Sequence, residues 1–340
     1  PSQPPFFIDP PTTDTSTRLD SSAASDVYKR QPLLPVVHRP MLERSIAGLA
    51  RAGVDEVVLA LGFRPDTFEQ AFPSGAVDGV RLRYAIEPEP LDTAGAVRFA
   101  ADDAGVRERL LVLNGDVLTD LDVASLLALH ERSGGSATIH LTEVEDPSRF
   151  GVVPIDDQNR VLAFVEKPPA ESAPSRWINA GTYVFEPEVL DLIPAGRPVS
   201  MEHEIFPALV EAGQLYALQD DSYWIDAGTP RAFLDASLDL VDGTRSTETA
   251  IHPTAIVHGT ASVRRSVISR DASVFAGSTV ENSVVLDGAQ IGPRATVSDS
   301  IIGPRGRIGA SAVLSELCVT GDDAQIAEGA VHVGERLPDQ

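Results

Sequence analysis

Between residues 251 and 319, one aliphatic side chain recurs with steps of six, six and five residues, a period of seventeen. Small or turn-forming residues fill most of the positions between. One inward aliphatic residue per short strand is typical of a parallel β-helix of triangular cross-section, in which each coil stacks on the last. The matching positions are Ile251, Val257, Val263, Ile268, Val274, Val280, Val285, Ile291, Val297, Ile302, Ile308, Leu314 and Val319.

The repeat also predicts how this part of the chain ends. The step from Val319 to Ile326 is seven residues, so we expect an irregular last coil that acts as a cap. We place the β-helix at residues 251–334, after a polar linker, DGTRSTETA, at 242–250. Open coil ends and flat aliphatic faces favour self-association, so the sequence predicts a homo-oligomer.

Residues 32–241 have a different pattern, in which helices and strands alternate. A helical spacing of aliphatic residues over 42–50 is followed by the buried strand VDEVVLALGF at 54–63. The alternation continues through RLLVLNGDVL, VASLLALHERSG and SATIHLTEV. Such alternation predicts a mostly parallel α/β sheet with helices on both faces. In such sheets, ligands bind outside the carboxyl ends of the strands.

Charge and cysteine usage exclude some classes of function. The net charge is −23, from 50 acidic and 27 basic residues, so a nucleic-acid or anionic-membrane surface is not expected. The single cysteine, Cys318, cannot form an internal disulfide, and we expect it to be buried. No apolar run approaches the roughly 20 residues of a membrane span. We therefore expect a cytoplasmic protein without membrane contact.

Three short segments carry residues suited to phosphate chemistry. Asn114, Gly115 and Asp116 end a buried strand, where Asp116 is either a Mg²⁺ ligand or part of a plain turn. VEKPPA places Glu166 beside Lys167 where a strand meets two prolines, so that the two side chains can contact different parts of one ligand or can simply be solvated. WINAGTYVF has a glycine inside a strand, which indicates a close backbone approach or a bulge.

A fourth segment is YWIDAGTPRAFLDAS. Asp226 follows two aromatic residues and is a second candidate metal ligand. Thr229 and Pro230 have the residue types of an N-cap and of the first helical position, so we also expect a helix to begin here. The two interpretations use different residues and are compatible.

The order of these segments is more specific than any one of them. LNGD, FGVV, VEKP, INAG and WIDAGTP precede the hexapeptide β-helix, and QPLLPVV and PLDTAGA fit the same pattern. Over about residues 32–334, the chain resembles the nucleoside-diphosphate-sugar pyrophosphorylases, above all the bacterial mannose-1-phosphate guanylyltransferases (GDP-mannose pyrophosphorylases). The resemblance implies a Rossmann-like nucleotidyltransferase sheet followed by a left-handed parallel β-helix.

The same resemblance implies a reaction. The phosphate of a sugar 1-phosphate attacks the α-phosphorus of a nucleoside triphosphate and pyrophosphate leaves; the best match is mannose 1-phosphate with GTP. It also implies roles: Asp116 and Asp226 would hold Mg²⁺, Lys167 would hold the sugar phosphate and Glu166 would bind sugar hydroxyls. Gly151 and Asn179 would lie along the sugar, and Asn114, Gly115 and Gly181 would belong to the same substrate site.

The front of the chain departs from this pattern. The family opens with an apolar strand and a loop, Gly-Gly-x-Gly-Thr-Arg-Leu, whose backbone N–H groups hold the triphosphate. Here no glycine precedes Gly48, and residues 1–31 have no helix or strand period. We interpret residues 1–31 as a disordered or non-native leader, since SSAASDVYKRQ resembles a translated sequencing adapter. The nucleotidyltransferase domain, residues 32–241, would then lack its first strand and phosphate loop, and we expect negligible turnover.

Asp92 is the candidate for nucleotide selection. It stands in PLDTAGA, where many relatives have glycine. Its carboxylate can accept hydrogen bonds from guanine N1–H and N2–H₂ together, which uracil and thymine cannot donate. The alternative is that Asp92 is the N-cap of a helix beginning at Thr93.

Two other functions stay open at this point. A non-catalytic regulatory subunit would explain the missing loop, but Asp116, Lys167 and Asp226 would then have no evident use. A hexapeptide acyltransferase would use a histidine of the β-helix, although a histidine at a coil corner is more often simply exposed. The candidates for that role are His252, His258 and His332.

Overall fold

A computed structural model describes residues 6–9, 31–62 and 65–337. These residues fall into two compact units. The first contains 6–9 and 42–224, and the second contains 31–41 and 225–337. None of the helices in this part of the chain has the length and hydropathy that crossing a bilayer requires.

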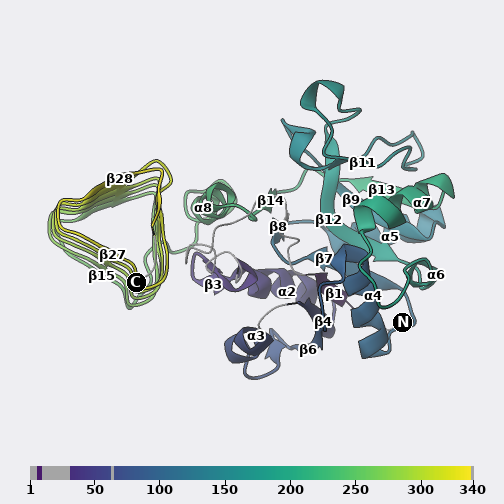
Figure 1. Cartoon of the computed structure of the whole chain (residues 1–340), viewed down its shortest axis with the longest axis horizontal. Helices are drawn as coiled ribbons and strands as arrows, with labels where there is room; N and C mark the ends of the chain where they lie inside the picture. Colours follow the sequence, from purple (N-terminus) through teal and green to yellow (C-terminus); the bar gives the residue numbers. More distant parts are fainter. Residues whose placement is uncertain (1–5, 10–30, 63–64, 338–340) are drawn as a thin grey trace. The chain divides into compact units, whose positions relative to one another are not determined.

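The first unit is built on a mixed sheet with the strand order β11-β10-β12-β7-β1-β4-β6-β5, with β9 and β13 attached through β12 (Figure 1). The continuous parallel part, β7-β1-β4-β6, is the parallel sheet that the sequence predicts, and antiparallel β12 joins it to β9. The strands are β1 (Phe6–Asp9), β4 (Glu56–Leu61), β5 (Ala76–Val77), β6 (Val80–Ile86), β7 (Leu110–Asn114), β9 (Ala137–Glu143), β10 (Gly151–Val152), β11 (Val165–Glu166), β12 (Trp177–Phe185) and β13 (Leu215–Gln219).

Strand β1 corrects the interpretation of the leader. It pairs in parallel with β4 on one side and with β7 on the other, so it is an inner strand of the sheet. The expectation that the sheet lacks its first strand is therefore wrong: FFID supplies one. A four-residue strand among proline, serine and threonine is too short to show a period, which is why the pattern did not reveal it. The predicted loss of the phosphate loop falls on residues 10–30, outside the described residues.

Helices pack on this sheet, and α5 ends at the glycine expected to close it. Helix α4 contacts β1, β4 and β6, and α5 contacts β9, β12 and β13. Asp122 caps α5, and Gly134, with a φ of 66°, ends it as the sequence predicts. The helical elements are α2 (Met41–Arg51), whose first residue belongs to the second unit, α3 (Pro65–Ala71), α4 (Asp92–Ala104), α5 (Val123–Ser133), η2 (Pro147–Arg149), η3 (Ala170–Ser172), α6 (Glu188–Asp191), η4 (Met201–Ile205) and α7 (Phe206–Glu211).

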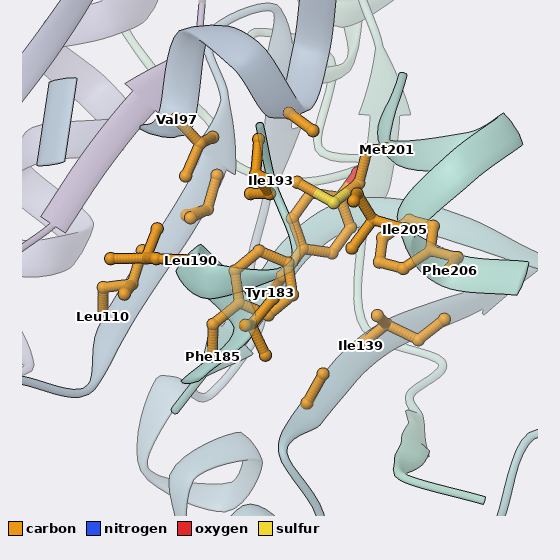
Figure 2. Close-up of a cluster of buried hydrophobic side chains, with 14 of the residues drawn as sticks. Val97, Leu110, Ile139, Tyr183, Phe185, Leu190, Ile193, Met201, Ile205 and Phe206 are labelled. Atoms are coloured by element: carbon orange, nitrogen blue, oxygen red, sulfur yellow. The ribbon is translucent and has the colours of Figure 1, made fainter. Parts of the chain in front are cut away.

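A buried cluster fixes η4 and α7 to strand β12. Phe206 lies 5.2 Å from Tyr183 between ring centroids, and the ring of Phe185 stacks on that of Tyr183. Figure 2 shows Met201, Ile205 and Phe206 gathered beside Tyr183. Side chains of this size, fully removed from water, contribute about 1.5–3 kcal/mol each. This packing holds rigid the segments that carry the candidate site.

One buried histidine in this unit gives a pH prediction. His140 on β9 is 1% exposed, and neither ring nitrogen has a hydrogen-bond partner among the described residues. Its Nε2 lies 3.5 Å from Oδ2 of Asp220. Burial lowers the pKa of His140 to about 4, and Asp220 opposes that shift only in part.

Because the unfolded chain protonates His140 near its ordinary pKa of 6.5, its contribution to stability is fully present above pH 6.5 and is lost as the pH falls towards about 4. We expect a loss of about 3 kcal/mol from this residue. Urea titrations at pH 7.5 and 4.5 test it against His140→Gln, whose stability should fall less between the two pH values. Equal falls in both proteins would contradict the assignment.

The second unit begins with a hairpin, joins α8 and continues into the β-helix. Thr229 Oγ1 accepts the N–H of Ala232 at 3.2 Å and Pro230 is the first helical residue, as predicted. His38, in the hairpin turn, contacts the linker through the carbonyl of Thr249 at 2.8 Å. The elements before the β-helix are η1 (Gln31–Leu33), β2 (Pro35–Val36), β3 (Arg39–Pro40) and α8 (Pro230–Asp239).

The β-helix is confirmed as a parallel β-solenoid of about five turns, whose triangular coils are evident in Figure 1. Its three five-stranded sheets pair residues seventeen apart, as Val263 with Val280 and Val280 with Val297. The first sheet holds β15 (Ile256–Val257), β18 (Ser273–Val274), β21 (Gln290–Ile291), β24 (Arg307–Ile308) and β27 (Gln325–Ile326). The second holds β16 (Ser262–Arg264), β19 (Thr279–Glu281), β22 (Thr296–Ser298), β25 (Val313–Ser315) and β28 (Val331–Val333), and the third holds β17 (Val267–Ile268), β20 (Val284–Val285), β23 (Ile301–Ile302), β26 (Val319–Thr320) and β29 (Arg336–Leu337).

The irregularity of the repeat lies one corner earlier than the sequence predicts. Glu316 and Leu317 both have positive φ, of 57° and 69°. The extra residue at this corner shifts the register, so Val319 pairs with Ile301. The stacked coils nevertheless bury Cys318 completely, as expected.

Candidate active site

The carboxyl end of β7 contacts a bulge in β12. Pairing between β12 and β9 shifts register between Asn179 and Tyr183, which marks a β-bulge. Inside it, Gly181 has a φ of 76°, which glycine adopts at little cost. A Cβ on Gly181 would lie 2.8 Å from Nδ2 of Asn114, the last residue of β7. Both predicted features of this segment, a bulge and a close approach, are present.

Asn179 is held by the same bulge. Its Oδ1 accepts the N–H of Gly181 at 3.1 Å, and its Nδ2 donates to the hydroxyl of Tyr183 at 3.0 Å. Trp224 supports the bulge, because its Nε1 donates to the carbonyl of Ala180 at 2.9 Å. The amide of Asn179 is thereby oriented before any ligand binds.

This gives a stability prediction for Gly181. Gly181→Ala should cost about 1–3 kcal/mol for the left-handed backbone, and more for the collision with Asn114. Gly196→Ala is the matched control, because Gly196 has a φ of 72° but no atom within 4 Å of the added Cβ. Denaturant unfolding of both variants isolates the collision. Equal losses would show that the contact with Asn114 is not tight.

Glu166 and Lys167 lie at the end of β11, the neighbour of β10. Gly151 is paired with Glu166 across these strands, and a Cβ at Gly151 would lie 2.5 Å from the ring of Phe164 and 3.0 Å from Oε2 of Glu166. Only glycine allows the Phe164 ring and the Glu166 carboxylate to pack this close to the strand. Nζ of Lys167 lies 3.7 Å from Oε1 of Glu166, and the Lys167 side chain is 50% exposed. The pair is therefore half-open to solvent, with the acid the more buried member.

The backbone at Lys167 is strained. Its φ is 46°, in the left-handed region, and it precedes Pro168. Such a conformation costs of order 1–3 kcal/mol and persists where the surroundings fix it, often at functional sites. Here the N–H of Lys167 donates to the carbonyl of Phe150 at 3.0 Å. The chain thus fixes the direction in which this lysine leaves the sheet.

The surroundings of Glu166 raise its pKa. Burial is the main cause, followed by the negative charge of Glu202, while Lys167 and His203 act in the opposite direction. Glu202 belongs to no motif noted in the sequence. Its place near Glu166 comes from the packing of η4, and the one local signal that could have drawn attention to this segment is Ser200, a residue type that caps helices.

Glu87 is a second carboxylate that sequence reasoning missed. It follows β6, is 8% exposed, and its Oε2 accepts the N–H of Leu91 at 3.0 Å. Burial raises the pKa of Glu87. Its other oxygen, Oε1, would lie 3.8 Å from a Cβ on Gly62, which follows β4. Glu87 is thus at the carboxyl edge of the parallel strands, where ligands of such sheets bind.

Asp92 lies in the same loop but is exposed. Its φ is 60°, and its Oδ1 accepts the N–H of Thr93 at 2.7 Å. The alternative in which it caps a helix from Thr93 is met only in part, because α4 begins at Asp92 itself and the N-cap is Leu91.

Two family models together match most of the chain. Residues 25–243 match the nucleotidyl transferase model and residues 246–337 match the GMPPB C-terminal domain. The chain belongs to the nucleotidyl transferase family. The first match includes residues 25–31, which we had assigned to the leader, and the division between the matches coincides with the predicted linker.

Relatives of this nucleotidyl transferase are named for one activity. It is 38% identical to the mannose-1-phosphate guanylyltransferase of Mycobacterium tuberculosis, over 73% of this chain and 71% of that protein. It is 40% identical to the mannose-1-phosphate guanylyltransferase catalytic subunit beta of Dictyostelium discoideum, over 61% of this chain and 57% of that one. The match to the second relative therefore spans less than two thirds of its length.

Solved structures agree on the fold. HddC from Yersinia pseudotuberculosis is 26% identical, with a TM-score of 0.58 over 69% of this chain and 98% of that one. A second structure of HddC, complexed with GMP-PN, is 25% identical with a TM-score of 0.57. A putative glucose-1-phosphate thymidylyltransferase from Bacillus anthracis, at 22% identity and a TM-score of 0.60, shows the fold alone.

The nucleotidyl transferase unit brings most of the predicted site residues together. The strand order β11-β10-β12-β7 places four adjacent strands side by side, and one or more candidates lie on or directly after each. Asp92 lies apart from them in sequence, at the start of α4. The grouped residues are Asn114, Gly115, Asp116, Gly151, Glu166, Lys167, Asn179 and Gly181.

The two candidate metal ligands belong to different units. Asp116 forms a turn between β7 and β8 (Val117–Thr119) in the first unit. Asp226 ends β14 (Trp224–Asp226) and belongs to the second unit, where its Oδ1 accepts the N–H of Gly228 at 2.8 Å. No group of three His, Cys, Asp or Glu that could hold a metal occurs within the ranges that the structure covers. The family generally uses a divalent metal ion, and two carboxylates are chemically suited to one.

The three histidines of the β-helix have structural contacts. Nδ1 of His252 pairs with Oγ1 of Thr254 and Nδ1 of His258 with Oγ1 of Thr260, both at 3.0 Å. His332 pairs with Glu335 at 2.9 Å. The contacts of His252 and His258 lie at turns of the coils, and that of His332 joins β28 to the segment before β29, so all three favour a structural role over acyl transfer.

Proposed function

We propose that this chain transfers GMP from GTP to mannose 1-phosphate. A phosphate oxygen of the sugar 1-phosphate forms a bond to the α-phosphorus, the bond from that phosphorus to the β-phosphate oxygen breaks, and pyrophosphate leaves. GDP-mannose is the other product. The observation that carries the proposal is the grouping of Glu166, Lys167, Asn179 and Asn114 on four adjacent strands. The relatives' names support the choice of substrates.

Each residue has a role that its chemistry allows. Lys167 offers a compact positive charge to the sugar phosphate, and its strained backbone fixes its direction. Glu166 accepts hydroxyl hydrogen bonds from the sugar, and Gly151 would lie along the sugar beside that carboxylate, where it has no side chain to collide with Phe164 or Glu166. Asn179, already oriented by the bulge, adds an amide along the sugar. Two anions must approach each other, so fixed positive charge and alignment provide most of the rate.

We also propose Mg²⁺ as the divalent ion, with Asp116 and Asp226 as its ligands. It would neutralise charge on the triphosphate when bound. Self-association through the β-solenoid remains our proposal for the assembly, because its flat coils present stacked sheet edges. The cytoplasmic location expected from the sequence also stays a prediction.

The direct test is to incubate the protein with GTP, mannose 1-phosphate and Mg²⁺ and to measure GDP-mannose and pyrophosphate together. We expect both in equal amounts. Of the two reasons for expecting negligible turnover, β1 removes one, but the absence of glycine before Gly48 remains, so the rate should be low. Binding of GDP-mannose without any product would favour the regulatory subunit. If the protein neither binds GDP-mannose nor forms any product, the proposal is contradicted.

A second test asks which of the two carboxylates after β6, Glu87 or Asp92, selects guanine. We propose Glu87 for this role beside Asp92, because Glu87 is buried at the sheet edge and keeps one oxygen for a ligand. Loss of a hydrogen bond to a charged group costs about 1.5–3 kcal/mol, so Glu87→Gln should reduce the preference for GTP over UTP about tenfold or more. Asp92→Ala is compared in the same competition assay. If only Asp92→Ala erodes the preference, the sequence-based assignment holds and Glu87 is structural.

A further inference from the structure

Element η4 (Met201–Ile205) is a π-helix, a rare turn that is found frequently at functional sites. Met201 and Ile205 bury their side chains in the cluster of Figure 2. Ser200 closes the start of the turn, because its Oγ accepts the N–H of His203 at 3.2 Å. The turn is therefore held both by the core and by its cap.

Glu202 fastens this turn to the start of α4. Its Oε2 accepts hydrogen bonds from the hydroxyls of Thr93 at 2.9 Å and of Ser200 at 3.0 Å. In return, Oγ1 of Thr93 accepts the N–H of Met201 at 2.7 Å. The N–H of Ala94 also donates to the carbonyl of Val199, at 2.9 Å. The position of the segment that carries Glu87 and Asp92, the carboxylates proposed to select the nucleotide, therefore depends on η4.

The other half of the site lies beside the same turn, because the ring of Phe206, the residue after η4, lies 4.8 Å between centroids from the ring of Phe164, two residues before Glu166. At this position the charge of Glu202 raises the pKa of Glu166, and the other charged groups that act on Glu166 are Lys167 and His203. Both hydrogen bonds that Glu202 accepts within the described residues use Oε2, so Oε1 takes no part in holding Thr93 and Ser200. One side chain therefore contacts the start of α4 and acts electrostatically on the end of β11.

We propose that Glu202 is a positioning residue shared by the two substrate sites, fixing Thr93 on the nucleotide side and setting the charge around Glu166 on the sugar side. The inference rests on the proposed function, because it assigns the loop of Glu87 to the nucleotide and Glu166 to the sugar. The two tasks use different properties of one carboxylate. Holding Thr93 needs only an acceptor oxygen, whereas acting on Glu166 needs the negative charge.

Two substitutions separate these tasks. Glu202→Gln keeps an acceptor oxygen and removes the charge, and Glu202→Ala removes both. We expect Glu202→Ala to raise KM about tenfold for both GTP and mannose 1-phosphate. In Glu202→Gln, KM for GTP should return to the wild-type value, while KM for mannose 1-phosphate should stay higher than in the wild type. Glu204→Gln is the matched control, since Glu204 lies on the same turn, pairs with the exposed Arg197 at 2.8 Å, and glutamine keeps an oxygen to accept the N–H of Ser200. It should leave both values unchanged.

A readout without turnover keeps the inference distinct from the proposed function. In a protein labelled with ¹³C at glutamate carboxyls, the pKa of Glu166 is read by NMR titration, with Glu166→Gln to assign its signal. Removing the charge of Glu202 should lower this pKa in Glu202→Gln and leave it unchanged in Glu204→Gln. An unchanged value in Glu202→Gln overturns the inference. Failure of the wild type to bind or turn over either substrate, with the NMR shift present, overturns the proposed function instead.

Discussion

Replacing Lys167 by methionine should reduce kcat/KM for mannose 1-phosphate by roughly 30- to 5,000-fold. The estimate follows from the loss of one partner of a buried or half-buried charge pair, about 2–5 kcal/mol. The chain has 25 arginines but only two lysines, Lys29 and Lys167, so within the described residues no second lysine can substitute. Methionine keeps most of the length of the side chain and removes the charge alone.

The same variant has a second signature. Lys167 opposes the increase in the pKa of Glu166, so its loss should raise that pKa further. Binding of the sugar phosphate requires ionised Glu166. As the pH falls, binding should therefore be lost at a higher pH in Lys167→Met than in the wild type. Arg160→Met is the control: Arg160 forms an exposed pair with Asp156 at 3.1 Å, and such pairs contribute about 0–1 kcal/mol. Equal kinetics in Lys167→Met and the wild type would remove this lysine from the mechanism.

Replacing Asp116 by asparagine should lower kcat by roughly 10²–10³-fold and raise the Mg²⁺ concentration needed for half-maximal rate. The change keeps the size of the side chain and removes the charge that a divalent ion requires. The measurement is the rate as a function of Mg²⁺ concentration at saturating GTP and mannose 1-phosphate.

Asp122→Asn provides the matched control for Asp116. Asp122 lies six positions further along, caps α5 by accepting the N–H of Ala124 at 3.1 Å, and asparagine is an equally good cap. Its rate and metal dependence should be those of the wild type. An Asp116→Asn enzyme with unchanged metal dependence would show that the carboxylate does not bind the ion.

The sequence predicted those parts of the fold that have a long period or a fixed order of motifs. Twelve of the thirteen predicted aliphatic positions keep the seventeen-residue register of the solenoid and Val319 is displaced by one residue, because each coil must present the same inward face to its neighbours. The ends of β7 and β11 and the bulge inside β12 were found because Asn-Gly-Asp, Glu-Lys-Pro and Asn-Ala-Gly interrupt apolar strands. Ligands of such sheets bind beyond the carboxyl ends of parallel strands, so Asn-Gly-Asp indicated the candidate site before its geometry was known.

What the sequence did not show depends on contacts between distant residues. Strand β1 is four residues long and is recognised only by its pairing with β4 and β7. Glu202 reaches Thr93 across 109 positions, and no local pattern encodes that meeting. Glu87 is one of three acidic residues in EPEPLD, residues 87–92, and only its burial in the structure distinguishes it from the other two. The extra residue at Glu316 and Leu317 changed a corner without changing the composition of the repeat.

The affinity for GDP-mannose, measured in the wild type and in Lys167→Met, tests the central claim most directly, since it does not depend on a fast rate. Both tryptophans of the chain lie at the site, Trp177 at the start of β12 and Trp224 on the bulge, so their fluorescence reports occupancy. We expect saturable binding by the wild type and at least a 30-fold weaker Kd in Lys167→Met, with Arg160→Met unchanged. Equal affinity in all three proteins would contradict the assignment of this site to a sugar nucleotide.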